Sequence, residues 1–146
     1  MVVSVQEMGQ RAKKATAQVA GLSLSTRNAL LQNMGAALLM RQAEIIAANQ
    51  QDLADHGASL SRPMQKRLTL DAEALTAIAE SLAAVATLPD PLAGPYDTWE
   101  NHAGLQIVKK IVPLGVVAMI YEARPNVTVD AAALALKSGN CLLYTS

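Results

Sequence analysis

The apolar segment from Leu114 to Tyr121, LGVVAMIY, constrains the fold more than any other part of the sequence. A continuous run rich in Val and Ile is typical of a strand buried on both faces, as in a parallel sheet. A turn, an Ala-rich helix over residues 128–137 and a second apolar strand from Cys141 to Tyr144 follow it. Gly139 stands where a left-handed residue would end that helix. This order predicts a βαβ unit.

The first 88 residues carry apolar side chains at steps of three and four, which predicts helices. We expect helices over about residues 3–21, 26–55 and 72–86, with a short one between residues 60 and 70. Gly21 is expected to end the first helix. Ser23 or Ser25 is expected to cap the second and Asp71 the last, because their side-chain oxygens can accept from free N–H groups.

Three Pro and one Gly within residues 89–97 predict a connector. We therefore divide the chain into an N-terminal helical region (1–88), a connector (89–104) and a region of strands and one helix (105–146). A half-covered strand is expected near Leu105–Ile111, with Lys109 and Lys110 facing solvent. The predicted fold class is α/β, in which N-terminal helices precede the start of a doubly wound, Rossmann-like parallel sheet. Because no connection follows the last strand, we expect the chain to be truncated.

The charge balance argues against two classes of partner. Twelve Lys and Arg residues match twelve Asp and Glu residues, so no basic footprint indicates a nucleic acid or an anionic membrane. The apolar runs are too short or too interrupted to span a bilayer, and the N-terminal segment lacks the core of a signal peptide. One Cys and two His exclude an internal disulfide and supply no zinc ligand set. We therefore predict a cytoplasmic protein without a metal site.

The best candidate site is the turn YEARPN, residues 121–126, between the apolar strand and the Ala-rich helix. Ligands of open α/β sheets bind outside the carboxyl ends of the strands. Glu122, Arg124 and Asn126 bring three polar side chains to this corner. Asn126 could donate its amide hydrogens to a developing oxyanion, a contribution typically worth about 10²–10³ in rate. Alternatively, Asn126 caps the helix and Arg124 pairs with Glu122 or Asp130.

Other candidate residues give weaker signals. Neither GxGxxG nor GxxxxGK[ST] occurs in the chain. Cys141 lies in a strand-like apolar segment, where a buried and inert thiol is the usual interpretation. The basic residues near position 65 are interpreted as surface groups; they are Arg62, Lys66 and Arg67.

The segment 112–140, VPLGVVAMIYEARPNVTVDAAALALKSGN, resembles the gamma-glutamyl phosphate reductase family, also called glutamate-5-semialdehyde dehydrogenases. This family belongs to the aldehyde dehydrogenase superfamily. PLGV, IYEARPNVTVD and LKSGN match its pattern in order and spacing, and weaker matches extend the resemblance to about residues 5–140. The resemblance implies an N-terminal fragment whose residues 105–146 begin the cofactor-binding domain. The tail CLLYTS departs from the family pattern.

The resemblance also implies an activity. The family reduces L-glutamyl 5-phosphate to L-glutamate 5-semialdehyde with NADPH and releases phosphate, which is the second step of proline biosynthesis. Attack by a Cys thiolate is implied, but that Cys belongs to a later domain, so the nucleophile is absent from this chain. Asn126 would be the oxyanion donor, and Glu122, Ala123 and Arg124 would line the nicotinamide end of the site. A homo-oligomer is implied for the full-length protein.

Two alternatives remain open at this point. One is a non-enzymatic helical interaction module, and the other is a different acyl-reducing relative, such as a CoA-acylating dehydrogenase. The YEARPN corner discriminates against the interaction module, which has no need for it. We expect the 146-residue chain alone to be inactive and to fold weakly, with Leu142, Leu143 and Tyr144 exposed on an open strand edge.

Overall fold

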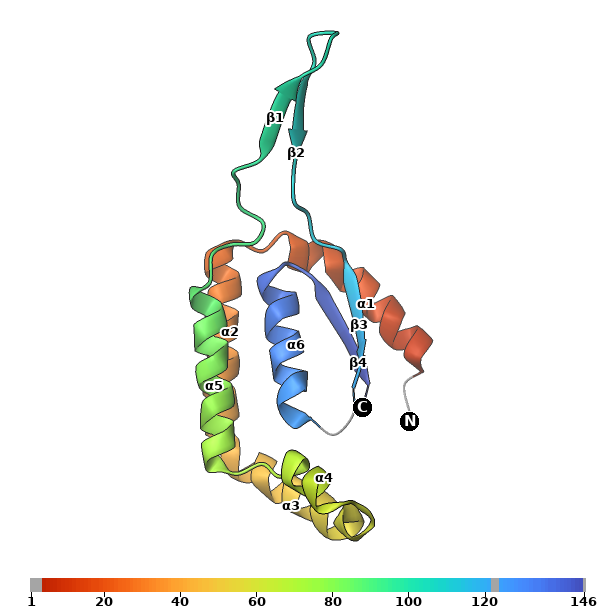
Figure 1. Cartoon of the computed structure of the whole chain (residues 1–146), viewed down its shortest axis with the longest axis vertical. Helices are drawn as coiled ribbons and strands as arrows, with labels where there is room; N and C mark the ends of the chain where they lie inside the picture. Colours follow the sequence, from red (N-terminus) through yellow and green to blue (C-terminus); the bar gives the residue numbers. More distant parts are fainter. Residues whose placement is uncertain (1–3, 122–123, 146) are drawn as a thin grey trace.

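The computed structural model describes residues 4–121 and 124–145 of the chain. It shows a mixed α/β arrangement of helices, one two-stranded antiparallel sheet and one two-stranded parallel sheet (Figure 1). The helical elements are α1 (Val5–Ala20), α2 (Leu24–Met40), α3 (Gln42–His56), the 3₁₀ turn η1 (Gly57–Ser59), α4 (Arg62–Leu68), α5 (Ala72–Thr87) and α6 (Pro125–Lys137). The strands are β1 (Asp97–Glu100), β2 (Gln106–Lys109), β3 (Val116–Ile120) and β4 (Cys141–Thr145).

Local caps set the ends of the N-terminal helices, as the sequence predicts. Ser23 Oγ accepts from the backbone N–H of Thr26 at 3.1 Å, and Asp71 Oδ1 accepts from that of Ala74 at 2.8 Å. Helix α1 ends at Ala20, and the N–H of the C-cap residue Gly21 donates to the carbonyl of Ala17. These three predictions are confirmed, because a cap depends on residues only two to four positions away.

The single helix expected over residues 26–55 is wrong. It is two helices, α2 and α3, which meet at Arg41 with φ −101° and ψ 17°. No Gly or Pro marks the break, and the Arg41 side chain instead forms an ion pair with Glu44 at 2.7 Å. The bend carries α3 underneath the N-terminal end of α6 (Figure 1). Ile45 and Ala48 of α3 then face Leu70 and Pro125 across a hollow.

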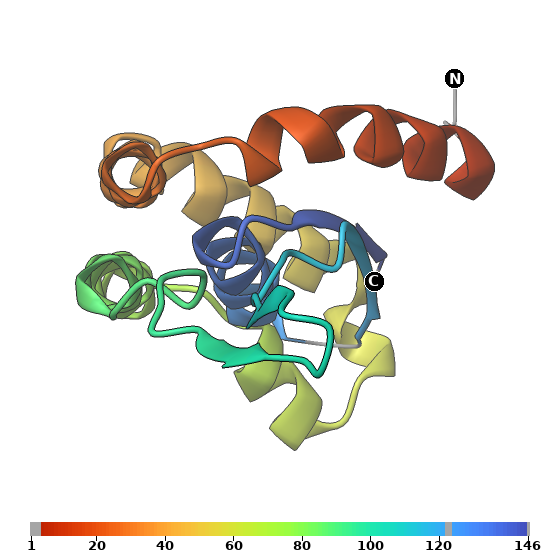
Figure 2. The ribbon, with the colours of Figure 1, turned by 90° about the horizontal axis from the view of Figure 1, so that it is seen from above.

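The hydrophobic core lies where α2, α5 and α6 meet. Figure 2 shows α2 and α5 almost end-on, with α6 packed against both. Leu31 and Leu82 are fully buried there, with Ala86 and Ala133 beside them. A Cβ atom at Gly35 would lie 3.4 Å from the carbonyl oxygen of Ala79, so the small residue lets α2 and α5 approach closely. The buried residues of the hydrophobic core cluster therefore all come from these three helices.

Strands β3 and β4 pair in parallel, with α6 as the crossover, which confirms the predicted βαβ unit. The register places Val116 opposite Cys141 and Ile120 opposite Thr145. Gly139 has a φ of +71°, and a Cβ atom there would lie 2.9 Å from Pro113 Cγ. The left-handed conformation predicted for this residue is therefore confirmed, and the close approach of Pro113 is a second reason for glycine.

The burial expected for these strands is only partly correct. Strand β3 is covered on one face: Val117 and Met119 are half-buried, whereas Ala118 is exposed and Ile120 is 84% exposed. The expected burial on both faces is therefore wrong for the described chain. Exposure of Leu142 and Leu143 is also wrong, because α1 packs along β4 and leaves both half-buried. Tyr144 is exposed as expected.

A β-hairpin projects away from the rest of the molecule (Figure 1). Residues 97–100, expected as part of a connector, form β1, which pairs with β2 so that Trp99 lies opposite Ile107. Asn101 closes the turn, since its Oδ1 accepts from the N–H groups of Ala103 and Leu105. Lys109 faces solvent, as predicted. Within the described ranges, no helix combines the length and the apolar character needed to cross a bilayer.

Candidate functional site

The corner after β3 carries the residues that the sequence singles out. Glu122 and Ala123 lie outside the described residues. Arg124 is exposed, and its carbonyl accepts from the N–H of Val127 at 3.0 Å as α6 begins. Among the described residues, Arg124 forms no ion pair with Asp130, so that part of the alternative interpretation is wrong. The cation is therefore presented to solvent at the carboxyl end of β3.

Asn126 lies in the first turn of α6, after Pro125, and is exposed. It does not cap the helix, because α6 begins without a side-chain cap hydrogen bond. Its Nδ2 instead donates to Asp130 Oδ2, one turn later, at 3.2 Å. An amide nitrogen carries two hydrogens, so one N–H of Asn126 is left for another acceptor. The unpaired N–H groups of the first helical turn add partial positive charge at the same place.

Asp130 links α6 to α5. Its second oxygen, Oδ1, lies 3.2 Å from Ser81 Oγ, which also lies 3.0 Å from the carbonyl of Ile78. Both carboxylate oxygens therefore contact neutral groups, and among the described residues Asp130 has no cationic partner within 4 Å. The side chain is half-buried, so its two contacts hold it in one orientation.

Asn126 and Asp130 form one wall of a groove of about 390 Å³ between α4, α5 and α6. Ser81 and Ile78 of α5 and Arg67 of α4 also line it. The sequence assigned Arg67 to the surface; it is exposed, but it faces this groove. Sequence analysis missed this role because Arg67 is far from Asn126 along the chain, and only the tertiary fold brings both to one groove.

A second, larger hollow of about 600 Å³ lies on the other side of Pro125, under the bend between α2 and α3. Its lining is mainly apolar, including Leu38, Ile45 and Val129. The charged residues at its rim include Arg41 and Glu44, which already pair with each other. The corner is thus flanked by a mainly apolar hollow and by a groove that carries the charged residues Arg67 and Asp130.

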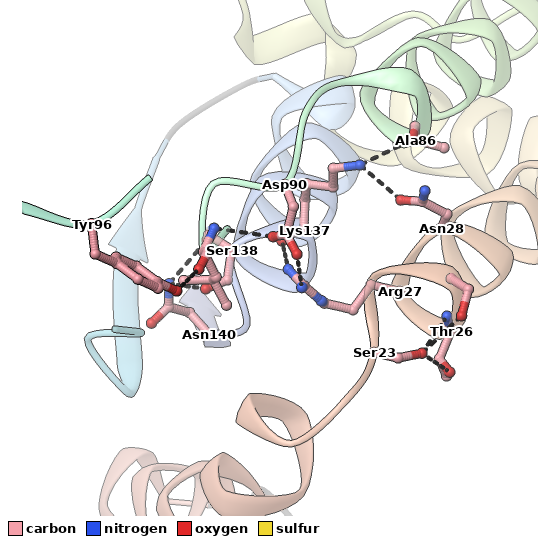
Figure 3. A network of polar contacts seen from close by, with 12 residues as sticks. Ser23, Thr26, Arg27, Asn28, Ala86, Asp90, Tyr96, Lys137, Ser138 and Asn140 are labelled. Carbon is pink, nitrogen blue, oxygen red and sulfur yellow. Dashed lines mark hydrogen bonds and ion pairs between the residues drawn. The ribbon is translucent and has the colours of Figure 1, made fainter. Parts of the chain in front are cut away.

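A buried polar cluster at the opposite end of α6 is a feature that sequence analysis also missed (Figure 3). Arg27 and Lys137 are each 3% exposed. The Arg27 guanidinium donates to Asp90 Oδ2 at 2.8 Å and to the carbonyl of Lys137. Lys137 Nζ donates to Asn28 Oδ1 at 2.7 Å and to the carbonyl of Ala86 at 2.9 Å. One signal was available: Arg27 precedes Leu31 by four residues and so lies on the buried stripe of α2.

The cluster shifts the pKa of two of its members. Burial lowers the pKa of Lys137, and the nearby Arg27 charge lowers it further, against a raising effect of Asp90. Burial alone would raise the pKa of Asp90, but the Leu92 amide and the Arg27 guanidinium together bring it below its ordinary value. Two cations and one carboxylate meet in low dielectric, so these contacts tie α2 and the connector to α6.

Cys141 is buried at the start of β4, and its N–H donates to the carbonyl of Gly115 at 2.8 Å. Because β3 and β4 are parallel, this places the thiol at the edge of the sheet opposite to the corner with Asn126. The predicted buried thiol is confirmed. Within the described residues, no three potential metal ligands cluster.

Comparisons with known proteins agree on one family. The chain is 65% identical over 143 residues to the gamma-glutamyl phosphate reductase of Leuconostoc citreum, and 48% identical over 136 residues to that of Oenococcus oeni. These alignments cover 98% and 93% of the chain but only 34% and 32% of the relatives. The chain therefore spans about a third of the length of the curated relatives it matches. No family model matches the chain.

Solved structures give the same result. The gamma-glutamyl phosphate reductase of Thermotoga maritima superposes with a TM-score of 0.91 and 30% identity, over 97% of this chain and 34% of that one. The gamma-glutamyl phosphate reductase of Saccharomyces cerevisiae superposes with a TM-score of 0.88 and 29% identity, over 99% and 37%. The arrangement of helices and strands described above is therefore shared with both.

Proposed function

Because this chain is a homologue of the gamma-glutamyl phosphate reductases, we propose that it forms part of an enzyme that reduces L-glutamyl 5-phosphate to L-glutamate 5-semialdehyde with release of phosphate. The reaction would serve proline biosynthesis in the cytoplasm. The identity of 65% over 143 residues carries this proposal. A doubly wound, Rossmann-like sheet, of which β3, α6 and β4 are one unit, belongs to the proposal.

Asn126 is the proposed oxyanion donor. Attack on an acyl phosphate turns the carbonyl oxygen into an oxyanion, which needs a preorganised donor. Asn126 supports this role because it lies in the first turn of α6 and keeps one amide hydrogen free of Asp130. No residue of this chain supplies the nucleophile in the proposal, since Cys141 is buried at the other edge of the sheet. The attacking thiolate would come from outside these 146 residues.

The proposed cofactor is NADPH, held by Glu122, Ala123 and Arg124. The fit rests on Arg124, an exposed cation without an ion-pair partner among the described residues, at the strand end where α/β sheets bind nucleotides. Its planar fork suits a phosphate or carboxylate group. When bound there, NADPH supplies the hydride that reduces the substrate carbon.

A homo-oligomer is the proposed state of the full-length protein. The β1–β2 hairpin supports this, because it projects from the body of the chain and exposes Trp99, Leu105 and Val108. Exposed apolar groups of this size are typical of surfaces that another chain covers. Light scattering after gel filtration of the full-length protein would measure its mass directly.

A chimeric enzyme tests the proposed activity. Residues 1–140 of this chain would replace the matching part of the Leuconostoc citreum reductase, and oxidation of glutamate 5-semialdehyde with phosphate and NADP⁺ would be measured. We expect activity, and a loss of about 10²–10³ in kcat for Asn126→Ala. Asn33→Ala, on the exposed face of α2, is the matched control and should retain full activity.

Two results would contradict the proposal separately. A folded chimera without activity, beside an active parent enzyme, would refute the function. An active chimera in which Asn126→Ala behaves like Asn33→Ala would refute only the role of Asn126.

A further inference from the structure

The groove beside Asn126 holds one anion and one cation that do not pair with each other. Asp130 lines it from α6 and Arg67 from α4. Among the described residues, neither forms an ion pair within 4 Å. By contrast, Arg41 and Glu44 at the larger hollow already pair with each other, and the rest of that lining is mainly apolar. The smaller groove therefore offers two separate charges of opposite sign to a ligand.

We propose that this groove binds the α-amino acid end of the substrate, with Asp130 receiving the ammonium group and Arg67 the α-carboxylate. The inference rests on the proposed function, because it takes Asn126 to face the reacting acyl carbon. It names a recognition site for the part of the substrate that does not react. Asp130 and Arg67 would then decide which acyl phosphates are accepted.

The spacing on α6 fits this assignment. In a glutamyl group, four bonds separate the α-nitrogen from the acyl carbon, a span of about 5 Å when extended. Asn126 and Asp130 are four residues apart on one helix, and such side chains have Cβ atoms about 5–6 Å apart. A substrate lying along this face can therefore place its acyl carbon near Asn126 and its ammonium near Asp130.

The contacts of Asp130 prepare it for a cation. Ser81 Oγ and Asn126 Nδ2 each lie 3.2 Å from one of its oxygens, which fixes the plane of the carboxylate. A carboxylate has about four acceptor positions, so two neutral contacts leave room for an ammonium group. A ligand that lacks this group would leave the charge uncompensated in a half-buried position.

Arg67, the cation of the groove, can bind a carboxylate with two parallel N–H groups. Its neighbour Lys66 is also an exposed cation but does not line the groove. The two residues therefore differ in position while sharing a charge, which makes Lys66 a control for nonspecific attraction.

Ligand titrations of the ¹⁵N-labelled 146-residue chain, followed by NMR, would test the inference. The probes are L-glutamate, glutarate, which lacks the ammonium, and 4-aminobutyrate, which lacks the α-carboxylate. We expect L-glutamate to shift the side-chain amide of Asn126 and the backbone amides of Ser81 and Asp130. It should bind about tenfold more tightly than either analogue, as expected for one charged hydrogen-bond contact.

Substitutions connect each preference to one residue. Asp130→Asn should abolish the preference for L-glutamate over glutarate, and Arg67→Gln should abolish the preference over 4-aminobutyrate. Lys66→Gln should leave both preferences intact. Circular dichroism of each variant would confirm that its helices are retained.

Three results would overturn the inference: equal binding of L-glutamate and both analogues, shifts that avoid the groove at every soluble concentration, or an equal effect of Lys66→Gln and Arg67→Gln. Failure of the proposed function is distinguishable, since it concerns turnover by the chimera. A groove that discriminates the probes in an inactive chimera would refute the reductase activity but not the amino acid site.

Discussion

Replacing Asp90 by Asn tests how much the buried polar cluster contributes to stability. Asp90 is the only carboxylate within 4 Å of Arg27 among the described residues, at 2.8 Å, and the two side chains are 15% and 3% exposed. Removing one partner of a buried ion pair typically costs about 3–5 kcal/mol. Asn keeps a neutral acceptor at the same position, so we expect the lower loss of a charged hydrogen bond, about 2–3 kcal/mol.

Urea unfolding of the 146-residue chain at pH 7, followed by circular dichroism, measures this loss. The unfolding midpoint should fall while the slope stays constant, because the surface exposed on unfolding does not change. Asp97→Asn is the matched control, because the Asp97 side chain is 78% exposed and its carboxylate lies 3.9 Å from Lys109 Nζ. This variant should have the same unfolding midpoint as the unmodified chain. Equal midpoints for Asp90→Asn and Asp97→Asn would refute the reasoning.

The pH dependence gives an independent readout of the same contact. The pKa of Asp90 is lower in the folded chain than its ordinary value of 3.8. A carboxyl group of this kind stabilises the fold above that ordinary value, and the contribution is lost as the pH falls through the lower, folded pKa. The unmodified chain should therefore lose stability below about pH 4 more steeply than Asp90→Asn does.

Two further substitutions test the packing. Leu82→Ala removes a fully buried side chain from the contact of α2, α5 and α6 and should lower the free energy of unfolding by about 2–5 kcal/mol. Thr87→Ala, at an exposed position of the same helix, is the control and should leave the free energy of unfolding almost unchanged. Gly139→Ala forces a side chain into φ +71° and within 2.9 Å of Pro113, so it should cost about 2 kcal/mol or more; a variant as stable as the unmodified chain would contradict this.

The elements that the sequence predicts well are those set by near neighbours. Ser23 and Asp71 cap their helices through bonds three residues away, and Gly139 needs only its own backbone conformation and a following strand. The break at Arg41 was not predictable in this way, since no helix-breaking residue occurs there. Strand β1 escaped notice because its four residues are all exposed and alternate in no regular pattern.

In the candidate site, too, contacts between near neighbours were predictable and contacts made by the tertiary fold were not. Asn126 and Asp130 are one turn apart, so their contact belongs to local helix geometry. The alternative interpretation of the sequence paired Arg124 with Glu122 or Asp130, because opposite charges alone suggest such pairs. Arg67 and Ser81 reach the groove only through the packing of α4 and α5, and Asp90 meets Arg27 across 63 residues of chain. Contacts of that range depend on the tertiary fold and leave no periodic signal.

The polar cluster and the groove lie at opposite ends of α6, and the first helps to position the second. The buried face of α6 includes Ala133 and Ala135. Their side chains are small, so they only weakly oppose a movement of α6 along α2 and α5. Hydrogen bonds are directional, so the contacts of Lys137 with Asn28 and Ala86 fix the helix along its axis. Asp130 lies seven residues earlier, about 10 Å along the helix. Any movement of α6 along its axis at the polar cluster would therefore also displace Asp130 in the groove.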